Sequence, residues 1–333
     1  MVETIYPRTK DISVLSSRAR AAVALTAAAA LTLAACGSDE PSQADRTATG
    51  VVDQVEVTPG TDKDAPKITL EDKTVSVEKT EVKTVKEGKG APVAEDDIVV
   101  LDIALFNGKD GSALEGTETY TQEPLAFDLG NAQMIPGLRN AILGQKVGST
   151  ATAIAPPAEM FGEAGNEQLG VSGTDSIVMV YDLKSTMLKE AKGKEAKPKK
   201  GVPVVQYATD KPATFTMPKG TAPKETEVET LVAGEGPEVK KGDTVYVTYT
   251  GALWKDGKVF DSSKQEGRRP FPVTLGGGQV IKGWDEGLVG TKVGDRVLIT
   301  VPPKDGYGKA GSQDGSIKGD DTIVFVVDVL GAV

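Results

Sequence analysis

The sequence contains no histidine and only one cysteine, Cys36. Without histidine, the chain lacks the side chain that most often acts as a general base or metal ligand near neutral pH. A single cysteine cannot form an intrachain disulfide, a zinc cluster or a redox-active dithiol. Catalysis by this chain therefore has to rely on shape, apolar surface, hydroxyls, carboxylates and backbone groups, and we expect no metal and no cofactor.

Positive charge is also scarce. The chain has 38 lysines and arginines against 48 aspartates and glutamates, which gives a formal net charge of −10. Binding to phosphate groups needs a basic face, so we expect no nucleic-acid partner. The length of 333 residues and the hydrophobic fraction of 39% are sufficient for two ordinary globular domains with additional tails.

The one cysteine lies at the end of an N-terminal apolar segment. Arg18 and Arg20 precede an Ala/Leu/Val-rich stretch over 21–33, which is too short to predict a spanning helix. The charged flank and the small residues at its end are typical of a secretion signal over residues 1–35. The run Leu33-Ala34-Ala35-Cys36 resembles a bacterial lipobox, which implies a diacylglyceryl thioether on Cys36. The alternative is an ordinary signal peptide with a coincidental cysteine.

A lipid anchor at this position has consequences for location and organisation. We expect the mature protein to lie on the extracytoplasmic face of the cell membrane, attached through its acyl chains. Residues 36–65 are rich in Gly, Ser, Thr, Asp and Pro and show no sustained periodicity. This composition predicts a flexible tether between the membrane and the first domain.

The rest of the sequence repeats itself at a fixed spacing of 146 residues (256 − 110), which indicates a duplicated domain. No insertion or deletion is needed to align residues 66–186 with residues 212–332. The matching positions include Asp256-Gly257 with Asp110-Gly111, Pro270-Phe271 with Pro124-Leu125, Gly306-Tyr307-Gly308 with Met160-Phe161-Gly162, and Val293-Gly294 with Val147-Gly148. We therefore expect two domains, at 66–186 and 212–333.

The segment between the two copies, residues 187–211, is rich in lysine and also contains glycine and proline. This composition favours a solvated linker. A patch that binds an anionic surface is the alternative.

Each copy is expected to be mainly β-structure. In the second copy, residues 244–250 alternate in the way typical of a half-buried strand, and 296–301 and 322–330 are rich in β-branched residues. Residues 255–258 predict a turn, and apolar residues at helical spacing predict a short helix over 281–289. The expected fold class is α+β, a twisted antiparallel sheet wrapped around one short helix.

Five blocks of the second copy together resemble the signature of the FKBP family of peptidyl-prolyl cis/trans isomerases. The resemblance covers residues 225–333 and depends on the order of the blocks, since any one of them alone is unspecific. The blocks are Val247-Thr248-Tyr249-Thr250-Gly251, Lys258-Val259-Phe260-Asp261-Ser262-Ser263, Pro270-Phe271, Val280-Ile281-Lys282-Gly283-Trp284 and Tyr307-Gly308.

The resemblance implies a role for each matching position. Trp284 is expected to form the floor under a substrate proline, and Asp261 to face the carbonyl of the rotating amide. The Ile281 N–H and the Tyr307 hydroxyl are expected to hold the flanking carbonyls. The expected catalytic residues are Tyr249, Phe260, Asp261, Trp284 and Tyr307, and the expected substrate-binding residues are Phe271, Val280, Ile281, Ile317 and Phe325.

The reaction suits a chain without histidine. Rotation about an X–Pro bond has a barrier near 20 kcal/mol because the planar amide loses its resonance. No bond is made or broken, so neither a nucleophile nor a metal is required. An enzyme has to bind the twisted amide better than the planar one, and an apolar aromatic pocket with few polar groups is suited to this task.

The first copy does not retain the aromatic floor or the two side-chain hydroxyls. A shift of 146 residues places Leu138 at the position of Trp284 and Phe161 at that of Tyr307. The other replacements are Ile103, Leu114, Glu115, Leu125, Met134 and Met179, and Ile135 keeps the isoleucine of position 281. Apolar character is preserved, so we expect a degenerate domain that keeps the fold with weak or no isomerase activity.

Two functional hypotheses follow. In the first, the chain is an isomerase that assists the folding of proline-containing exported polypeptides, because X–Pro isomerisation is slow enough to limit folding. In the second, both domains are chaperone modules that bind unfolded or proline-containing segments, and turnover is incidental. The family resemblance also implies that macrolides of the rapamycin class bind in the Trp284 pocket as inhibitors.

Overall fold

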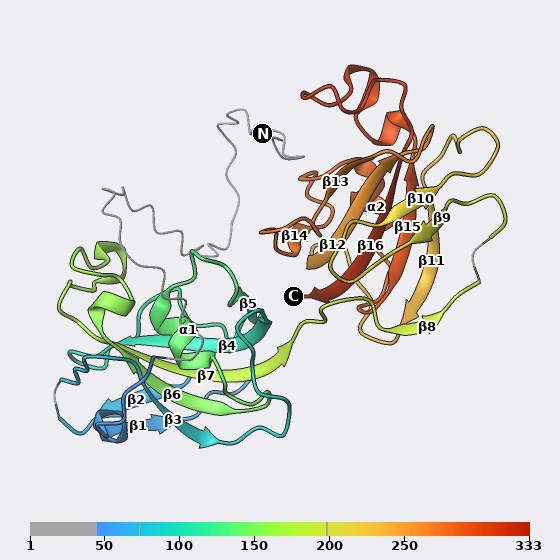
Figure 1. Cartoon of the computed structure of the whole chain (residues 1–333). Helices are drawn as coiled ribbons and strands as arrows, with labels where there is room; N and C mark the ends of the chain where they lie inside the picture. Colours follow the sequence, from blue (N-terminus) through green and yellow to red (C-terminus); the bar gives the residue numbers. More distant parts are fainter. Residues whose placement is uncertain (1–44, 73, 198) are drawn as a thin grey trace. The chain divides into compact units, whose positions relative to one another are not determined.

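A computed structural model describes residues 45–72, 74–197 and 199–333. They form two compact units, one extending to Met187 and the other beginning at Leu188 (Figure 1). The predicted signal segment and Cys36 lie outside the described residues. Within the described part of the chain, no helix is long and apolar enough to cross a membrane.

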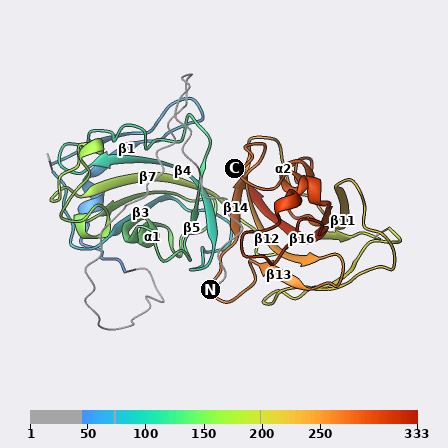
Figure 2. The ribbon, with the colours of Figure 1, turned by 90° about the horizontal axis from the view of Figure 1, so that it is seen from above.

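The C-terminal unit is an antiparallel sheet with one α-helix. Helix α2 (Lys282–Gly287) packs against β15, and Figure 1 and Figure 2 show it lying across the sheet. The strand order is β13 (Val259–Ser262), β12 (Thr244–Leu253), β16 (Ile323–Ala332), β15 (Arg296–Val301), β11 (Glu227–Gly234) and β8 (Gly193–Glu195), with β14 (Phe271–Thr274) also paired to β12. The inner faces of these strands and the helix enclose the main core of this unit.

The N-terminal unit has the same plan. Helix α1 (Pro136–Ile142) packs against β6, and its core is formed by apolar side chains of the helix and the sheet. The strand order is β3 (Glu81–Lys86), β6 (Thr150–Ala155), β7 (Ile177–Thr186), β4 (Ile98–Asn107) and β5 (Leu125–Asp128). Short 3-10 helices complete the two units at Val51–Gln54, Pro157–Glu159, Glu167–Leu169, Pro303–Asp305 and Gly308–Ala310.

The duplication predicted from the sequence is visible in the element boundaries. Strands β4, β5, β6 and β7 begin and end 146 residues before β12, β14, β15 and β16, as the starts of β4 and β12 show (244 − 98). Helices α1 and α2 also begin 146 residues apart (282 − 136). The predicted strands and the α+β class are confirmed. The helix expected over 281–289 is shorter, because after Gly287 the chain turns toward Gly290, which has a positive φ of 84°.

The predictions of a free tether and a free linker are wrong for the residues that the structure describes. In the first unit, β1 (Val55–Thr58) and β2 (Lys67–Leu70) form a hairpin, and Val52 and Val55 are buried. In the second unit, β9 (Val204–Gln206) and β10 (Thr214–Thr216) form a hairpin, and β8 extends the main sheet by pairing with β11.

The physical reason is that both faces of each sheet are apolar. Leu298, Val324 and Val326 lie on the outer face of the C-terminal sheet, away from the main core, and pack with Ala213 of the hairpin. A strand that is apolar on both faces, as 323–330 is, needs cover on both sides. The hairpins supply that cover. The domain boundaries expected between residues 65 and 66 and between residues 211 and 212 are therefore misplaced, because each falls between the two paired strands of a hairpin.

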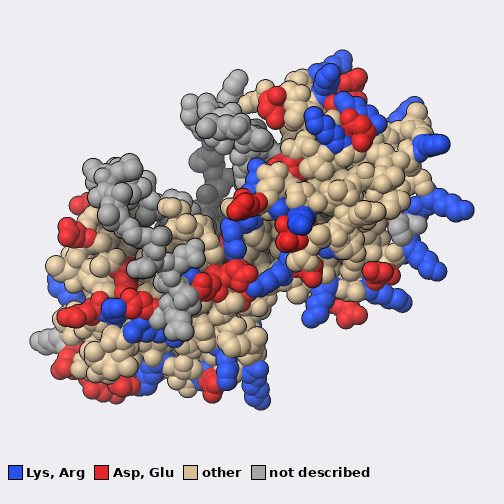
Figure 3. Space-filling model, in the orientation of Figure 1, with Lys and Arg blue, Asp and Glu red and all other residues tan. Residues whose placement is uncertain are grey.

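Charged side chains are spread over both units. On the face drawn in Figure 3, lysines and arginines are interspersed with aspartates and glutamates rather than gathered into a basic patch over the described residues. Many of them are paired, as are Lys255 with Asp321 and Lys304 with Glu225.

Candidate active site

An aromatic cluster centred on Trp284 occupies the inner face of the C-terminal sheet. Trp284, on α2, is 4% exposed, and the ring centroids of Tyr249 and Phe325 lie 5.1 and 5.2 Å from its own. Phe271 lies 6.3 Å away, and Phe260 contacts Phe325 at 5.7 Å. All of these pairs are edge-to-face, the arrangement that the quadrupoles of aromatic rings favour.

A glycine in strand β12 makes room for these rings. Gly251 lies directly opposite Phe325 in the pairing of β12 with β16. A Cβ atom at Gly251 would lie 2.7 Å from Phe260 Cζ and 2.7 Å from Phe325 Cε1. Contacts that short do not occur between carbon atoms in well-packed interiors, so any side chain at this position has to displace both rings.

One carboxylate lies beside the aromatic cluster. Asp261, on β13, is 3% exposed. Its Oδ2 accepts a hydrogen bond from the Tyr249 hydroxyl at 2.6 Å, and its Oδ1 accepts one from Arg268 Nη1 at 2.6 Å. A buried carboxylate is stable only when it is paired and hydrogen-bonded. The two donors therefore fix Asp261 in place.

Two hydrogen-bond donors at the edge of the cluster have no partner among the described residues. They are the hydroxyl of Tyr307 and the backbone N–H of Ile281, which precedes α2, and both residues are partly exposed. Burial and the nearby negative charge of Asp261 raise the pKa of Tyr307 to about 12. The Tyr307 hydroxyl therefore keeps its proton throughout the neutral range and is available to a carbonyl oxygen.

The structure brings the residues predicted from the sequence into one place. Ile317 is buried in the loop after Tyr307, Phe271 begins β14, and Val280 precedes the helix. The apolar and aromatic residues of the predicted set either belong to the main core of the unit or pack directly against it. Their assignment to catalysis and to substrate binding stays a prediction.

Sequence reasoning missed the roles of Arg268 and Gly251. Arg268 is one of several charged residues in the loop 263–270. Nothing in the sequence shows that its side chain folds back onto Asp261. Gly251 is the last residue of the block 247–251, to which the sequence alone assigns no separate role. A glycine inside a strand signals that another group approaches the backbone closely, and Leu105 at the corresponding position of the first copy marks the difference.

In the N-terminal unit the corresponding space is filled. Leu105 replaces Gly251 and is 3% exposed, and Leu138, which replaces Trp284, is 2% exposed. Tyr181 replaces Val327 and is fully buried, with its hydroxyl donating to the Ala141 carbonyl at 2.6 Å. In the C-terminal unit, Tyr249 of β12 lies opposite Val327 of β16. At the same positions of the N-terminal unit, Ile103 of β4 lies opposite Tyr181 of β7. The aromatic bulk has moved to the other strand.

The sequence alignment of Glu115 with Asp261 needs a local correction. The Tyr249 N–H donates to Ser263 Oγ, whereas the Ile103 N–H donates to Thr119 Oγ1. The spacing between corresponding residues of the two copies is therefore 144 in this loop (263 − 119), two residues less than the 146 found in the strand before it (249 − 103). Glu115 is exposed and does not occupy the place of Asp261.

One polar atom of the aromatic cluster is unsatisfied. Trp284 Nε1 is buried and has no hydrogen-bond partner among the described residues. An unsatisfied buried donor costs about 1–3 kcal/mol, which offsets part of the stability that the buried indole ring contributes by packing. This cost is consistent with selection of the flat indole ring for a function.

Comparison with known proteins gives consistent results. The model of a family described as FKBP-type peptidyl-prolyl cis-trans isomerase matches residues 89–184 and 236–330, together more than half of the chain. An FK506-binding protein of Streptomyces anulatus is 38% identical over 114 residues, which cover 34% of this chain and 91% of that protein. A probable FK506-binding protein of Corynebacterium glutamicum is 39% identical over 117 residues, which cover 35% of this chain and 94% of that protein.

A solved structure is also similar. The crystal structure of the three FKBP domains of wheat FKBP73 covers 76% of this chain and 94% of its own, with 23% sequence identity and a TM-score of 0.32.

The requirement for glycine at 251 can be tested by unfolding the full chain in urea. We expect G251A to lower the free energy of unfolding of the C-terminal unit by about 1–3 kcal/mol, because the added methyl group overpacks Phe260 and Phe325. Tryptophan fluorescence reports this unit alone, since Trp254 and Trp284 are the only tryptophans of the chain.

The matched control is G277A, where the nearest neighbouring heavy atom lies 3.6 Å from an added Cβ. The expected change in the free energy of unfolding of this control is within about 0.5 kcal/mol. Equal stabilities of the two variants would show that the rings do not need this space.

Proposed function

We propose that the chain, which belongs to the FKBP-type peptidyl-prolyl cis-trans isomerase family, catalyses proline isomerisation with its C-terminal unit only. The observation that carries this proposal is the Trp284 cluster with its hydrogen-bonded Asp261, which is present in one unit and replaced in the other by Leu105, Leu138 and Tyr181. Fold alone does not decide activity, and both units have the fold.

The chemistry follows from the nature of the site. A proline ring that packs on the exposed edge of the aromatic cluster places its preceding amide in an environment with few polar groups. The planar amide is more polar than the twisted one, so transfer from water to this environment favours rotation. The hydroxyl of Tyr307 and the N–H of Ile281 are free to hold the carbonyls on either side while the bond between them rotates.

Asp261 has an electrostatic role in this proposal rather than that of a base. Both of its oxygens already accept hydrogen bonds, from Tyr249 and Arg268. No proton has to be transferred for an amide bond to rotate. The fixed carboxylate faces the rotating carbonyl, whose charge distribution changes as resonance is lost, and a preorganised charge acts without reorganisation at that moment.

The substrate class that fits this site is a proline-containing polypeptide segment. Members of the family bind proline-containing substrates and macrolides, and the curated relatives are named for FK506 binding. We propose that macrolides of the FK506 and rapamycin class occupy the same surface of Trp284 and inhibit the enzyme.

The N-terminal unit supports a second candidate function. Leu125, at the position of Phe271, is 39% exposed, and Met134, Ile135 and Phe161 pack against the core of the unit while remaining partly exposed. Flexible methionine side chains adapt to varied apolar partners. This unit therefore suits a binding module that holds an unfolded segment without isomerising it.

The cellular setting of the proposal comes from the N-terminal sequence. The lipobox-like run ending at Cys36 supports attachment to the outer face of the cell membrane by a lipid. The clients there would be exported polypeptides, which reach this side unfolded and whose X–Pro bonds isomerise in tens of seconds without a catalyst.

Replacing Trp284 by leucine in the full chain tests the site of catalysis. We expect W284L to lower kcat/KM for a proline-containing peptide by about tenfold or more, because the flat floor under the proline ring is lost. Leu138 shows that leucine packs at this position of the fold. The variant should therefore remain folded, as measured by the fluorescence of Trp254.

The matched control changes the same position of the other unit. L138V should leave kcat/KM unchanged, because the N-terminal unit does not catalyse the reaction in this proposal. A large loss of activity in L138V together with full activity in W284L would place catalysis in the N-terminal unit and refute the proposal.

The lipid anchor has its own test. When the chain is expressed in a bacterium with a labelled fatty acid, we expect the wild type to carry the label and C36S to carry none, because the thioether needs the cysteine sulfur. S38A, two residues away, serves as the control and should be labelled like the wild type. An unlabelled wild type would exclude lipidation at Cys36.

A further inference from the structure

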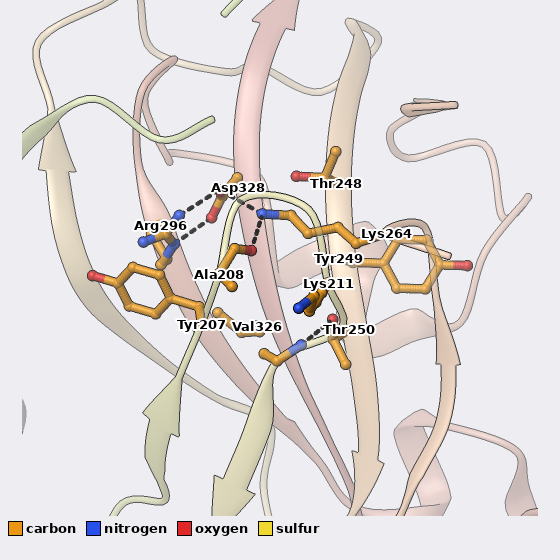
Figure 4. A pocket seen from close by; sticks show the side chains of 11 residues that line it. Tyr207, Ala208, Lys211, Thr248, Tyr249, Thr250, Lys264, Arg296, Val326 and Asp328 are labelled. Carbon is orange, nitrogen blue, oxygen red and sulfur yellow. Dashed lines mark hydrogen bonds and ion pairs between the residues drawn. The ribbon is translucent and has the colours of Figure 1, made fainter. Parts of the chain in front are cut away.

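The hairpin on the outer face of the C-terminal sheet lies behind the candidate active site. We use the term strap for residues 204–216, which comprise β9, β10 and the loop between them. The strap loop and the sheet line a small pocket of about 10 Å³ (Figure 4). The residues that line it include Tyr207, Ala208 and Lys211 of the strap and Thr248, Lys264, Arg296 and Asp328 beneath it.

Two hydrogen bonds attach the strap to the rest of the unit. The Ala213 N–H donates to Thr250 Oγ1 at 3.1 Å, and Lys264 Nζ donates to the Ala208 carbonyl at 3.3 Å. Lys264 Nζ also lies 3.9 Å from Asp328 Oδ2, and the Lys264 side chain is only 11% exposed. An ammonium group this enclosed depends on its partners, so Lys264 is held in one position (Figure 4).

A stacked ion pair supports the same loop of the strap. Arg296 forms two hydrogen bonds with Asp328, at 2.5 and 2.7 Å, and its guanidinium lies 3.5 Å from the ring centroid of Tyr207. Both partners of the ion pair are buried. The strap is therefore an integral part of the sheet rather than a loosely attached cover.

The residues that hold the strap alternate along the chain with those that form the site. Tyr249 faces the site, and Thr250, the next residue of β12, faces the strap, as alternation along a strand requires. The same holds on β13, where Asp261 faces the site and Ser262 Oγ lies 2.9 Å from Thr250 Oγ1. A shift of these strands on the strap side is therefore transmitted to the site side.

The loop 263–270 connects the two faces a second time. Lys264 lies at its start and binds the strap, and Arg268 lies further along and binds Asp261. The Lys264 N–H also donates to Ser262 Oγ at 3.1 Å. The contact of Lys264 with the strap therefore fixes the start of the loop, and this limits where Arg268 can lie further along it.

The N-terminal unit has a hairpin on the same face but lacks these polar attachments. Ala104 takes the place of Thr250, and Tyr120 follows Thr119 where Lys264 follows Ser263. Both Ala104 and Tyr120 belong to an apolar cluster beneath the β1–β2 hairpin. The polar attachment is thus found in the unit that also has the aromatic cluster and the buried carboxylate.

We propose that Lys264 and Thr250 are positioning residues, which use the strap to hold Asp261 and Arg268 in the geometry that isomerisation requires. This inference rests on the proposed role of the C-terminal site. It assigns a catalytic contribution to a segment, residues 204–216, that lies on the opposite face of the sheet and touches no substrate.

The test compares two lysines of the full chain that each form an ion pair with a buried aspartate. K264M removes the contacts with Ala208 and Asp328, and K255M removes the 2.6 Å pair with Asp321, in a turn that has no contact with Asp261. We expect K264M to lower kcat for a proline-containing peptide about tenfold, and K255M to change it less than twofold. K264R, which can donate to the same two acceptors, is expected to restore most of the activity.

A second pair of variants covers the case in which K264M fails to fold. T250A copies the first unit and removes the acceptor of the Ala213 N–H, whereas T250S retains it. We expect a loss of kcat in T250A and not in T250S, with both variants folded at the assay temperature by tryptophan fluorescence. The urea unfolding midpoint of T250A is expected to be lower, because the buried Ala213 N–H loses its acceptor.

Two results would overturn the inference. If K264M and T250A are folded and as active as K255M and T250S, the strap does not position the site. If W284L is as active as the wild type, the site itself is not catalytic, and the inference falls together with the proposed function.

Discussion

The close packing of Phe260 and Phe325 over Gly251 is the contact on which the candidate site depends. Because position 251 has no side chain, both rings reach into the space in front of β12, and Phe325 lies edge-on against Trp284. Trp284 itself has a buried N–H for which the described part of the chain supplies no acceptor. The cluster therefore combines an empty backbone position, which the two rings need in order to pack, with a donor whose missing acceptor lowers the stability of the fold.

The N-terminal unit shows what the same fold does without this constraint. Leu105 fills the place of Gly251, and Tyr181 brings its aromatic bulk from the neighbouring strand, anchored by a hydrogen bond to the end of helix α1. The strands and the helix keep their positions along the chain. The two units thus differ in their side chains, with an aromatic cluster around Trp284 in one and Leu105, Leu138 and Tyr181 in the other, rather than in architecture.

The sequence was sufficient to predict the duplication, the strands and the residues around Trp284, because each depends on local pattern or on motif order. It was not sufficient for the two hairpins, whose composition is typical of linkers and whose role is fixed by the apolar outer face of the sheet. The pairing of Arg268 with Asp261 and the two-residue shift that removes Glu115 from the site depend on how one loop folds back. Such loop geometry leaves no periodic signal in the sequence.

The most direct test of the account separates the two units. Each has its own core, so residues 45–187 and 188–333 should each fold as a separate polypeptide. The kcat/KM for a proline-containing peptide should then reside in residues 188–333, with the other polypeptide at or near the uncatalysed rate. Comparable activity in residues 45–187 would contradict the proposal that the aromatic cluster around Trp284 catalyses isomerisation.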